Sequence, residues 1–512
     1  MFASLLAPLD AWLNRVTMYR LVIAYLAALL GIAAAQSARG VLDYPPASIV
    51  GTTAVALVSC VAINSLFAET FGAPVNHDSA VITGLILALI VGPAQTPDDY
   101  VFLAWAATLA MASKYILAWR NVHLFNPAAI ALVATGLFAG QTASWWVGTA
   151  SLTPFVIGGG LLLTRRIRRG DLVGAFLWAT MFVTLAWSAL AGLPAAQALQ
   201  RGVVDSPLWF LGFAMLTEPV TTPPTRLRQL AYGLLAGALC VPQLHVGGFY
   251  FTPELALVVA NAGALPLRSW HKRRLRLAQA IPVGPGLIDF LYAPSRPLAY
   301  QPGQYMEWTL EHDRPDSRGQ RRYFTLASSP TERSLRIGVK FAEHGSTFKR
   351  ALAAHAWRGE SIVAAQIAGD FTLPRDPRRK LAFIAGGIGI TPFRSMVKYL
   401  TDRHEKRDVV LLYANRRCEE ILYRDVFTAA QRAFRFRPVY LLSDPSSAPP
   451  AWAGAVGRID AALIARQIPD YRERLFYVSG SPALVQSAQR ALRDLGVKPD
   501  RIKTDYFSGL AA

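Results

Sequence analysis

The chain has 512 residues, of which 53% are hydrophobic and 17% charged, and its formal net charge is +19. Soluble proteins average about 25% charged residues, so the composition excludes a disordered chain and argues against a wholly soluble globular one. The charges are uneven: residues 1–264 hold 22 of the 85 charged side chains, and residues 265–512 hold the other 63. The three cysteines form no CxxC pair, so we expect no chain-bound Fe–S cluster.

Apolar stretches recur through the first half, and several reach the roughly 18–20 residues that a helix needs to cross a bilayer. They lie at 21–38, 48–68, 79–92, 100–118, 123–140, 144–164, 172–191, 206–217, 229–245 and 251–267. A large buried core is the alternative, but so many stretches with so few charges between them argue against it. We therefore expect a polytopic α-helical membrane domain of about ten helices over residues 1–270.

Loop charges orient this domain. With ten spans and a cytoplasmic N-terminus, fourteen Lys and Arg residues fall on the cytoplasmic side, and only Arg39 and Arg201 fall outside. By the positive-inside rule the C-terminal half is cytoplasmic, in a multi-pass inner-membrane protein. The first stretch could instead be a signal peptide cut near residues 35–38, which would leave the later orientations unchanged. The basic run at 271–276 is interpreted as an anchor at anionic headgroups.

Two of the stretches, 79–92 and 206–217, are short and flanked by proline-containing segments. If the ten spans divide five and five, each is third in its half, and an odd number of spans inverts the second copy. Paired short segments in inverted repeats indicate a midplane site built on half-helices. Loop caps at membrane depth are the alternative.

The runs His123-Leu-Phe-Asn-Pro127, Asp78–Leu85 and Thr217–Pro223 resemble the membrane component that sodium-pumping NADH:quinone oxidoreductase shares with Rnf complexes, over about residues 15–270. That family often carries FMN on a threonine of a Ser-Gly-Ala-Thr stretch, which is absent here. The resemblance then allows only a noncovalent FMN or riboflavin in this half. The histidines in or beside the spans have no repeated spacing, so we expect no haem.

The second half changes character twice. Short strands such as Leu287–Tyr292 and Leu335–Phe341, separated by charged turns, predict a small antiparallel β-barrel over residues 271–378. From residue 379, apolar runs such as Leu381–Ala385 and Val409–Tyr413 alternate with helical stretches, which predicts an α/β domain with a parallel sheet over residues 379–512. No interleaving of aromatic and basic residues suggests nucleic acid.

A glycine-rich turn follows the first strand of the α/β domain. Gly386, Gly387 and Gly389 let the backbone approach a bound phosphate, while Thr391 can cap the next helix and Pro392 suits its first turn. A helix start of this kind offers N–H groups to an anion. The spacing is not that of the Rossmann fingerprint, and a plain strand–helix connector is the alternative.

Four further motifs follow the same order as in a known family. They are Arg322-Tyr-Phe324-Thr325, Gly345-Ser346-Thr347, Ser479-Gly480-Ser-Pro482 and the C-terminal segment that contains Phe507. With the glycine-rich turn, they resemble the ferredoxin–NADP reductase superfamily over about residues 278–509.

The resemblance implies a role for each motif. Arg322, with Gly345, Ser346 and Thr347 at a helix start, would hold the FAD diphosphate, Phe324 would pack on the isoalloxazine, and Thr325 would hydrogen-bond near flavin N5. The glycine-rich turn, Gly480 and Pro482 would receive the nicotinamide dinucleotide, and Phe507 would cover the flavin. Thr325, Ser479 and Phe507 are the expected catalytic residues. Phe324 replaces the family's tyrosine, and Ser479 replaces the cysteine of many members.

Coenzyme choice stays open between NADH and NADPH. Asn415 and Arg416, with Arg417, follow the second strand of the α/β domain, where the adenosine ribose would lie. Arginines there could pair with a 2′-phosphate, but the surrounding run looks as much like NADH-using members.

These observations predict an NAD(P)H-dependent FAD oxidoreductase that passes electrons to a membrane acceptor, which would be a quinone, a second flavin or a partner protein, with other membrane subunits as further partners. One alternative is a membrane-tethered ferredoxin or flavodoxin reductase, in which the net charge of +17 on residues 265–512 docks an acidic electron carrier. The other is a transporter or channel with a redox-sensing domain.

Overall fold

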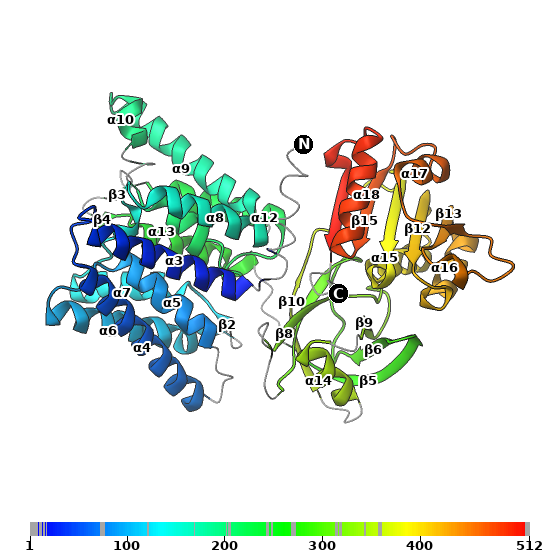
Figure 1. The fold of residues 1–512 in the computed structure, drawn as a ribbon, viewed down its shortest axis with the longest axis horizontal. Helices are drawn as coiled ribbons and strands as arrows, with labels where there is room; N and C mark the ends of the chain where they lie inside the picture. The colour runs from blue at the N-terminus through cyan, green and yellow to red at the C-terminus, as the bar shows by residue number, and fades with distance from the viewer. Residues whose placement is uncertain are drawn as a thin grey trace. The chain divides into compact units, whose positions relative to one another are not determined.

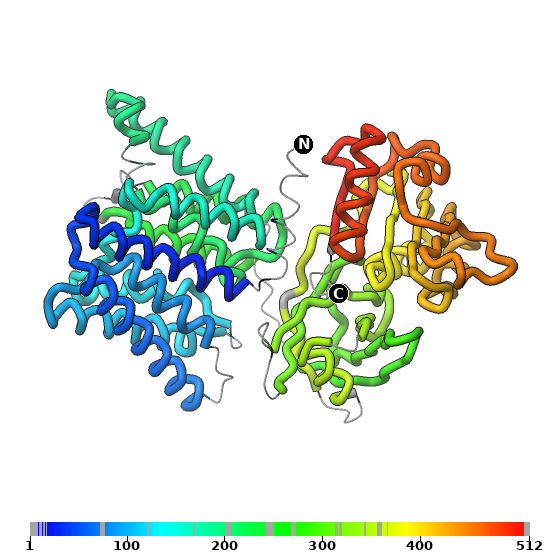
Figure 2. The backbone as a smooth tube through the Cα atoms, in the orientation of Figure 1, coloured from blue at the N-terminus to red at the C-terminus, as the bar shows by residue number. Residues whose placement is uncertain are grey.

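The computed structural model divides the chain into two compact units, Met1–Trp270 and His271–Ala512, which are called unit 1 and unit 2 here. Each is described by itself. The structure describes residues 9, 13, 16, 18–71, 77–119, 122–167, 169–200, 202, 206–241, 245–246, 249–267, 273–312, 316, 320–341, 345–356 and 361–506 (Figure 2).

Unit 1 is helical (Figure 1). Its first half contains α3 (Met18–Ala38), α4 (Pro46–Thr70), α5 (His77–Ile90), α6 (Pro97–Ile116) and α7 (Pro127–Ala139). Its second half contains α8 (Thr153–Ile167), α9 (Gly170–Leu190), α10 (Ala195–Leu199), α11 (Leu208–Phe210), the π-helix η3 (Leu211–Met215), α12 (Arg226–Leu239) and α13 (Pro253–Ala264). Short hairpins precede α7 and α13: β1 (Ala118–Trp119) with β2 (Val122–His123), and β3 (His245–Val246) with β4 (Phe249–Tyr250).

The two halves of unit 1 share an order of elements. In the first, α4 packs against α5 and α6; in the second, α9 packs against α12, with α11 and η3 in the place of α5. Each half then ends in a hairpin and a helix that starts with a side-chain cap followed by proline. The caps are Asn126, which accepts from Ala129 N at 3.1 Å, and Thr252, which accepts from Leu255 N at 3.4 Å.

Three of the described helices, α3, α4 and α9, are long and apolar enough to cross a membrane. The prediction of about ten such helices is not met in the part of the chain that the structure describes. Some of the other apolar runs are interrupted: the run 123–140 begins as strand β2 and becomes helical only at Pro127, and the run 206–217 divides into the three-residue α11 and the π-helix η3. Counting apolar residues ignores these breaks.

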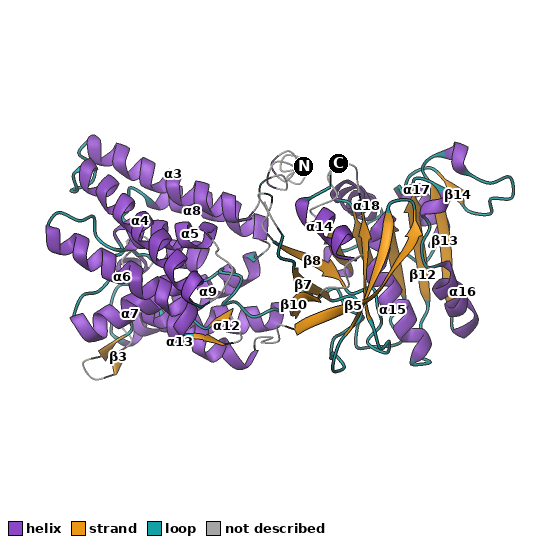
Figure 3. Cartoon of the chain, turned by 90° about the horizontal axis from the view of Figure 1, so that it is seen from below, coloured by secondary structure: helices purple, strands orange, loops and turns teal. Residues whose placement is uncertain are grey.

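Unit 2 contains two sheets (Figure 3). The first joins strands in the order β8-β7-β10-β5-β6-β9, and each pair is antiparallel. Its strands are β5 (Arg273–Gly284), β6 (Leu287–Ala293), β7 (Tyr305–Thr309), β8 (Arg321–Thr325), β9 (Leu335–Lys340) and β10 (Ser361–Ala368), and α14 (Thr347–Ala356) lies between β9 and β10 in the chain. Its core includes Phe290, Trp308 and Ile337, all fully buried. Arg273, Arg274 and Arg276 of the basic run lie in β5, residues 271 and 272 lie outside the described residues, and the interpretation as a headgroup anchor stays a prediction.

The second sheet is parallel and has the order β14-β13-β12-β11-β15-β16. Its strands are β11 (Leu381–Gly386), β12 (Val409–Asn415), β13 (Phe436–Leu442), β14 (Ala455–Val456), β15 (Leu475–Gly480) and β16 (Ile502–Tyr506). The helices are α15 (Thr391–Asp402), α16 (Arg424–Ala433), α17 (Ala461–Gln467) and α18 (Pro482–Asp494). Side chains alternate between two cores, with Phe383 and Tyr477 in one and Ile384 and Phe476 in the other, as expected of a parallel sheet covered on both faces.

The strand order reverses between β11 and β15, because β12, β13 and β14 follow on one side of β11 while β15 and β16 lie on the other. Ligands of open parallel sheets bind outside the carboxyl ends of the strands at such a switch point. This position directs attention to the residues that follow β11 and β15.

Candidate functional site

The glycine-rich turn lies at the switch point. A Cβ atom on Gly389 would lie 2.5 Å from the Ser479 carbonyl oxygen, and one on Gly386 would lie 2.5 Å from Leu484 Cδ1. Gly387 has a φ of +52°, with open space where a side chain would be. The turn therefore needs glycine to let β11, α15 and β15 approach closely, and it leaves the backbone accessible beside Gly387.

The helix starts differ in detail from the prediction. Thr391 is the first residue of α15, and its hydroxyl donates to Ile388 O at 3.1 Å instead of capping the helix. Ser481 does cap α18, by accepting from Leu484 N at 3.3 Å, and Pro482 opens that helix.

Two polar residues that the sequence predicted, Ser479 and Asn415, lie at the carboxyl ends of β15 and β12. Ser479 in β15 is fully buried, and its hydroxyl has no hydrogen-bond partner among the described residues. Gly480 follows it with a φ of +158°. Asn415 ends β12 and is 5% exposed, whereas the Arg416 side chain beyond it is exposed. A buried hydroxyl without a partner costs free energy, so Ser479 fits a site in which a ligand supplies the partner.

The second group of predicted residues surrounds an anion position in the antiparallel domain. Arg322 Nη2 donates to both carboxylate oxygens of Asp316, at 2.8 and 3.0 Å, and Thr347 N donates to Asp316 Oδ2 at 3.1 Å. Ser346 caps α14 by accepting from Lys349 N at 3.3 Å, and Gly345 precedes it in the chain. Here a guanidinium group and the N-terminus of a helix bind a carboxylate. A phosphate group prefers the same two kinds of donor.

Aromatic rings adjoin this anion position. Arg322 lies over the ring of Phe348, 5.4 Å from its centroid, and the rings of Phe324 and Phe348 are 5.9 Å apart. Arg322 and Phe324 are both partly buried, while Tyr323 between them is exposed, because side chains alternate along β8. Thr325 ends β8 and is 4% exposed.

Sequence reasoning missed two residues of this group. The pattern marks Phe348 only as part of a turn that opens a helix, and Asp316 only as part of a charged turn. Phe348 could have been found from its position directly after Gly345-Ser346-Thr347. No local pattern marked Asp316. Phe507 lies outside the described residues, so its predicted place over the flavin stays a prediction.

A polar clamp joins the two groups. Arg394 in α15 makes a bidentate ion pair with Glu332, at 2.8 and 3.0 Å, and donates to Ala327 O at 2.7 Å. Burial works to raise the pKa of Glu332, but hydrogen bonds and charge from Arg394 outweigh it and hold that pKa below its usual value. Ala327 follows Thr325 by two residues and Arg394 follows Thr391 by three, so the clamp connects the β8 motif to the nucleotide turn.

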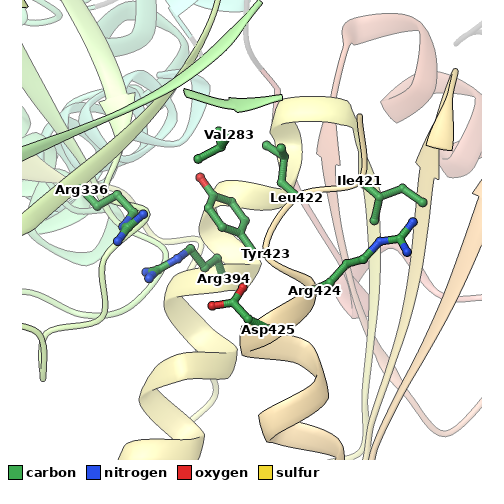
Figure 4. A pocket seen from close by; sticks show the side chains of 8 residues that line it. All are labelled: Val283, Arg336, Arg394, Ile421, Leu422, Tyr423, Arg424 and Asp425. Carbon is green, nitrogen blue, oxygen red and sulfur yellow. The ribbon is translucent and has the colours of Figure 1, made fainter. Parts of the chain in front are cut away.

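Tyr423 extends the clamp. Its hydroxyl donates to Asp289 Oδ1 at 2.7 Å, and Arg336 Nη1 pairs with Asp289 Oδ2 at 2.6 Å. Burial, together with the charge of Asp289, raises the pKa of Tyr423 well above its usual value. A cavity of about 360 Å³ adjoins these residues, and Figure 4 shows Tyr423 between Arg336 and Arg394 on one side and Arg424 on the other. It is lined by Val283, Arg336, Arg394, Ile421, Leu422, Tyr423, Arg424 and Asp425.

A third constellation lies in unit 1. His123 Nε2 lies 3.0 Å from Glu218 Oε1, and Asn126 Nδ2 and Thr221 Oγ1 donate to Glu218 Oε2 at 3.0 and 3.2 Å. This network unites two of the three motifs that resemble the membrane component of the respiratory complexes. The start of α7 is also tied to the last turn of α13, because Asn126 N donates to Asn261 Oδ1 at 2.7 Å.

The remaining motif of unit 1 is held by Lys114 of α6. Its ammonium group donates to the carbonyl oxygen and the hydroxyl of Ser79, at 3.1 Å each. Within the described ranges, no group of three His, Cys, Asp or Glu side chains could hold a metal ion.

The comparisons with known proteins bear on unit 2. The oxidoreductase NAD-binding domain family matches residues 383–490. The chain is 31% identical over 231 residues to the stachydrine N-demethylase reductase subunit of Rhizobium meliloti, covering 44% of this chain and 64% of the relative. It is 28% identical over 244 residues to the flavohemoprotein of Pseudomonas putida, covering 47% and 60%.

Among solved structures, the FAD/NAD-binding domain of nitric oxide dioxygenase from Vibrio cholerae matches with 23% identity and a TM-score of 0.40, covering 46% of this chain and 98% of that one. The chain spans about three fifths of the length of these two curated relatives.

The C-terminal half therefore matches an oxidoreductase NAD-binding domain and is similar to ferredoxin–NADP reductase-like FAD/NAD-binding units. Its relatives include reductase subunits and an NADPH oxidoreductase, which supports the prediction of an NAD(P)H-dependent FAD oxidoreductase. The resemblance of residues 15–270 to the membrane component of the two respiratory complexes stays a prediction.

One prediction needs correction. We expected no haem, but relatives of this chain include flavohemoproteins, from Pseudomonas putida among other organisms, so that expectation does not stand. The argument from histidine spacing addressed only a haem held between two histidines of facing helices. A single proximal histidine also holds haem in many proteins, so spacing alone could not exclude it. FAD and NAD(P)H remain supported.

Proposed function

We propose that the protein is a membrane-integrated flavin oxidoreductase that takes hydride from NADH or NADPH onto FAD in unit 2 and passes electrons to a membrane acceptor, either a quinone or a partner protein. The observation that carries this proposal is the 2.7 Å hydrogen bond from Arg394 to Ala327 O. It fastens the nucleotide turn to the strand that bears Arg322, Phe324 and Thr325, as direct hydride transfer between two bound cofactors requires.

The residues present fit both cofactors. For FAD, Arg322 and the start of α14 already hold a carboxylate, and Phe324 lies beside them on the same strand. For the nicotinamide dinucleotide, the glycines keep the backbone accessible at the switch point, and no described residue bonds the Ser479 hydroxyl. FAD, when bound, accepts a hydride and releases electrons singly.

The protein's own residues then position and shield these groups. Arg322 and the Thr347 N–H would hold the diphosphate, and the Ser479 hydroxyl would orient the nicotinamide. The clamp of Arg394 with Glu332 and Ala327 fixes the distance between the two sites. No side chain is needed as an acid or base for the hydride step.

Membrane integration is part of the same proposal. Large apolar side chains stand exposed on α4, at Val58 and Leu66, and on α9, at Trp178 and Phe182, with 56–69% of each accessible. Soluble proteins rarely expose large apolar patches, whereas lipid would cover side chains of this kind. We propose that unit 1 lies in the inner membrane, with the C-terminal half on the cytoplasmic side, as the loop charges favour.

Purified full-length protein in lipid tests the proposal. We expect acid to release FAD, NADH or NADPH to bleach the flavin absorbance anaerobically, and a quinone to restore it. Protein that binds no flavin, or a flavin that neither coenzyme reduces, would refute the reductase function. Recovery of active protein from the soluble fraction without detergent would refute membrane integration.

A second candidate is a membrane-tethered reductase for an acidic carrier protein such as a ferredoxin or flavodoxin. The net charge of +17 on residues 265–512 favours it. Because salt screens such docking, its rate with the carrier would fall steeply as salt is added, whereas quinone reduction would not change.

A further inference from the structure

The anion position beside Arg322 is filled by a carboxylate of the chain itself. We propose that Asp316 is an internal competitor for the FAD diphosphate, which holds Arg322 and the start of α14 until a diphosphate replaces it. This inference rests on the proposed function, because it takes FAD as the physiological ligand.

The carboxylate uses the principal donors of the position. Arg322 Nη2 reaches Oδ1 at 2.8 Å and Oδ2 at 3.0 Å, and the first backbone N–H of α14, on Thr347, reaches Oδ2 at 3.1 Å. Arg322 Nη1 donates to Arg321 O at 2.7 Å. The pair is well covered, with 12% of the Arg322 side chain and 24% of the Asp316 side chain exposed.

Asp316 is also fastened from its backbone. Its N–H donates to Thr347 Oγ1 at 2.9 Å, and His312 Nε2 lies 3.1 Å from the same hydroxyl. Asp316 therefore binds α14 through its main chain as well as its carboxylate. These contacts fix the position of the carboxylate at the start of α14, so its pairing with Arg322 is part of the fold.

A diphosphate and this carboxylate exclude one another. Both are anions, and both would accept from Arg322 Nη2 and Thr347 N–H, so their mutual repulsion prevents joint occupancy of those donors. Without a cofactor, Asp316 balances the charge of a largely buried guanidinium. For FAD to bind, the ion pair between Arg322 and Asp316 must first open. The apparent affinity for FAD is therefore the intrinsic affinity multiplied by the fraction of molecules in which this pair is open.

The test uses full-length protein stripped of flavin, with Asp316→Asn as the main variant and Asp316→Ala as a second. We expect the FAD dissociation constant, measured by flavin fluorescence, to fall about tenfold in both, which corresponds to about 1.4 kcal/mol. We expect the Tm of the flavin-free protein to fall as well, because Arg322 loses this ion pair. Opposite changes in affinity and in stability are the signature of a competitor.

Glu311→Gln is the matched control. Glu311 is exposed, lies five residues from Asp316 and carries the same charge, so both quantities should stay at the wild-type value. An equal gain in FAD affinity from Glu311→Gln would show a general charge effect and overturn the proposal. An unchanged or weaker affinity for FAD in the Asp316 variants would overturn it too.

Inorganic pyrophosphate separates this proposal from the proposed function. It should raise the Tm of Asp316→Asn more than that of the wild type, whether or not flavin binds. If pyrophosphate behaves so but neither protein binds FAD, the competitor stands and the flavin function fails. If the wild type and Asp316→Asn bind FAD equally, the competitor fails and the flavin function stands.

Discussion

Ser479 is a buried polar residue at a position for which the sequence predicted a catalytic role. It is fully buried at the carboxyl end of β15, and no described residue bonds its hydroxyl. The resemblance had marked this position as a departure, since many members of the superfamily place a cysteine there. A hydroxyl without a protein partner is one that a bound nicotinamide can use.

Ser479→Ala should therefore separate stability from activity. Removing an unpaired buried hydroxyl should leave the nucleotide-free protein equally stable, or more stable by about 1 kcal/mol. Hydride transfer from NAD(P)H should slow about tenfold, because the nicotinamide loses a positioning contact. Thermal melting and stopped-flow flavin bleaching measure the two effects, with Ser479→Cys as the conservative variant. A loss of stability without nucleotide would show that the hydroxyl already has a protein partner.

Helix α15 is the element that couples the two halves of the reductase. Its start carries the nucleotide turn, and one turn later Arg394 reaches Glu332 and Ala327 in the antiparallel domain. Only 5% of the Arg394 side chain is exposed, and 22% of Glu332, so the pair is protected from screening and contributes more than a surface ion pair.

The clamp should weaken in acid. The folded pKa of Glu332 lies below its usual value, so the carboxylate stabilises the fold above its unfolded pKa of about 4.3. That stabilisation is lost as the pH falls through the lower folded pKa. Glu332→Gln should cost about 2 kcal/mol at neutral pH, and the difference from the wild type should shrink below about pH 4. Melting of both proteins across this range checks it; a difference independent of pH would contradict it.

The same helix explains why the coupling could not be predicted. The spacing of Gly386, Gly387 and Gly389 indicates a turn that approaches a phosphate. The structure has this turn between β11 and α15. The partner of Arg394 lies 62 residues away in the chain, and no local pattern selects Glu332 over the other acidic residues. Only the packing of α15 on the antiparallel domain brings the two together.

At the scale of the whole molecule, two compact units of opposite character share one chain. Unit 1 exposes large apolar side chains, and unit 2 carries the reductase. The proposed function divides the chemistry in the same way: hydride transfer needs only unit 2, whereas delivery to a membrane acceptor needs both.

A protease site inserted between residues 270 and 271 tests this division. After cleavage in membranes, unit 2 should retain FAD and reduce a soluble one-electron acceptor with NAD(P)H at the uncut rate, because both cofactor sites lie within it. Quinone reduction should be lost, since the acceptor stays with unit 1. The uncut insertion variant is the control. Undiminished quinone reduction by released unit 2 would contradict the division of roles.

Local patterns were enough to predict the change in character near residue 270, the alternation of strands and helices after 380, and the motifs of the reductase, because periodicity and glycine placement act over a few residues. The sequence overestimated the number of long helices in unit 1, because breaks such as the cap and proline at the start of α7 interrupt apolar runs that look continuous. The tertiary structure alone decided which distant side chains meet: Asp316 with Arg322 and Thr347, Arg394 with Glu332, and Glu218 with His123. Such contacts depend on how whole elements pack, and that is a property of the complete chain.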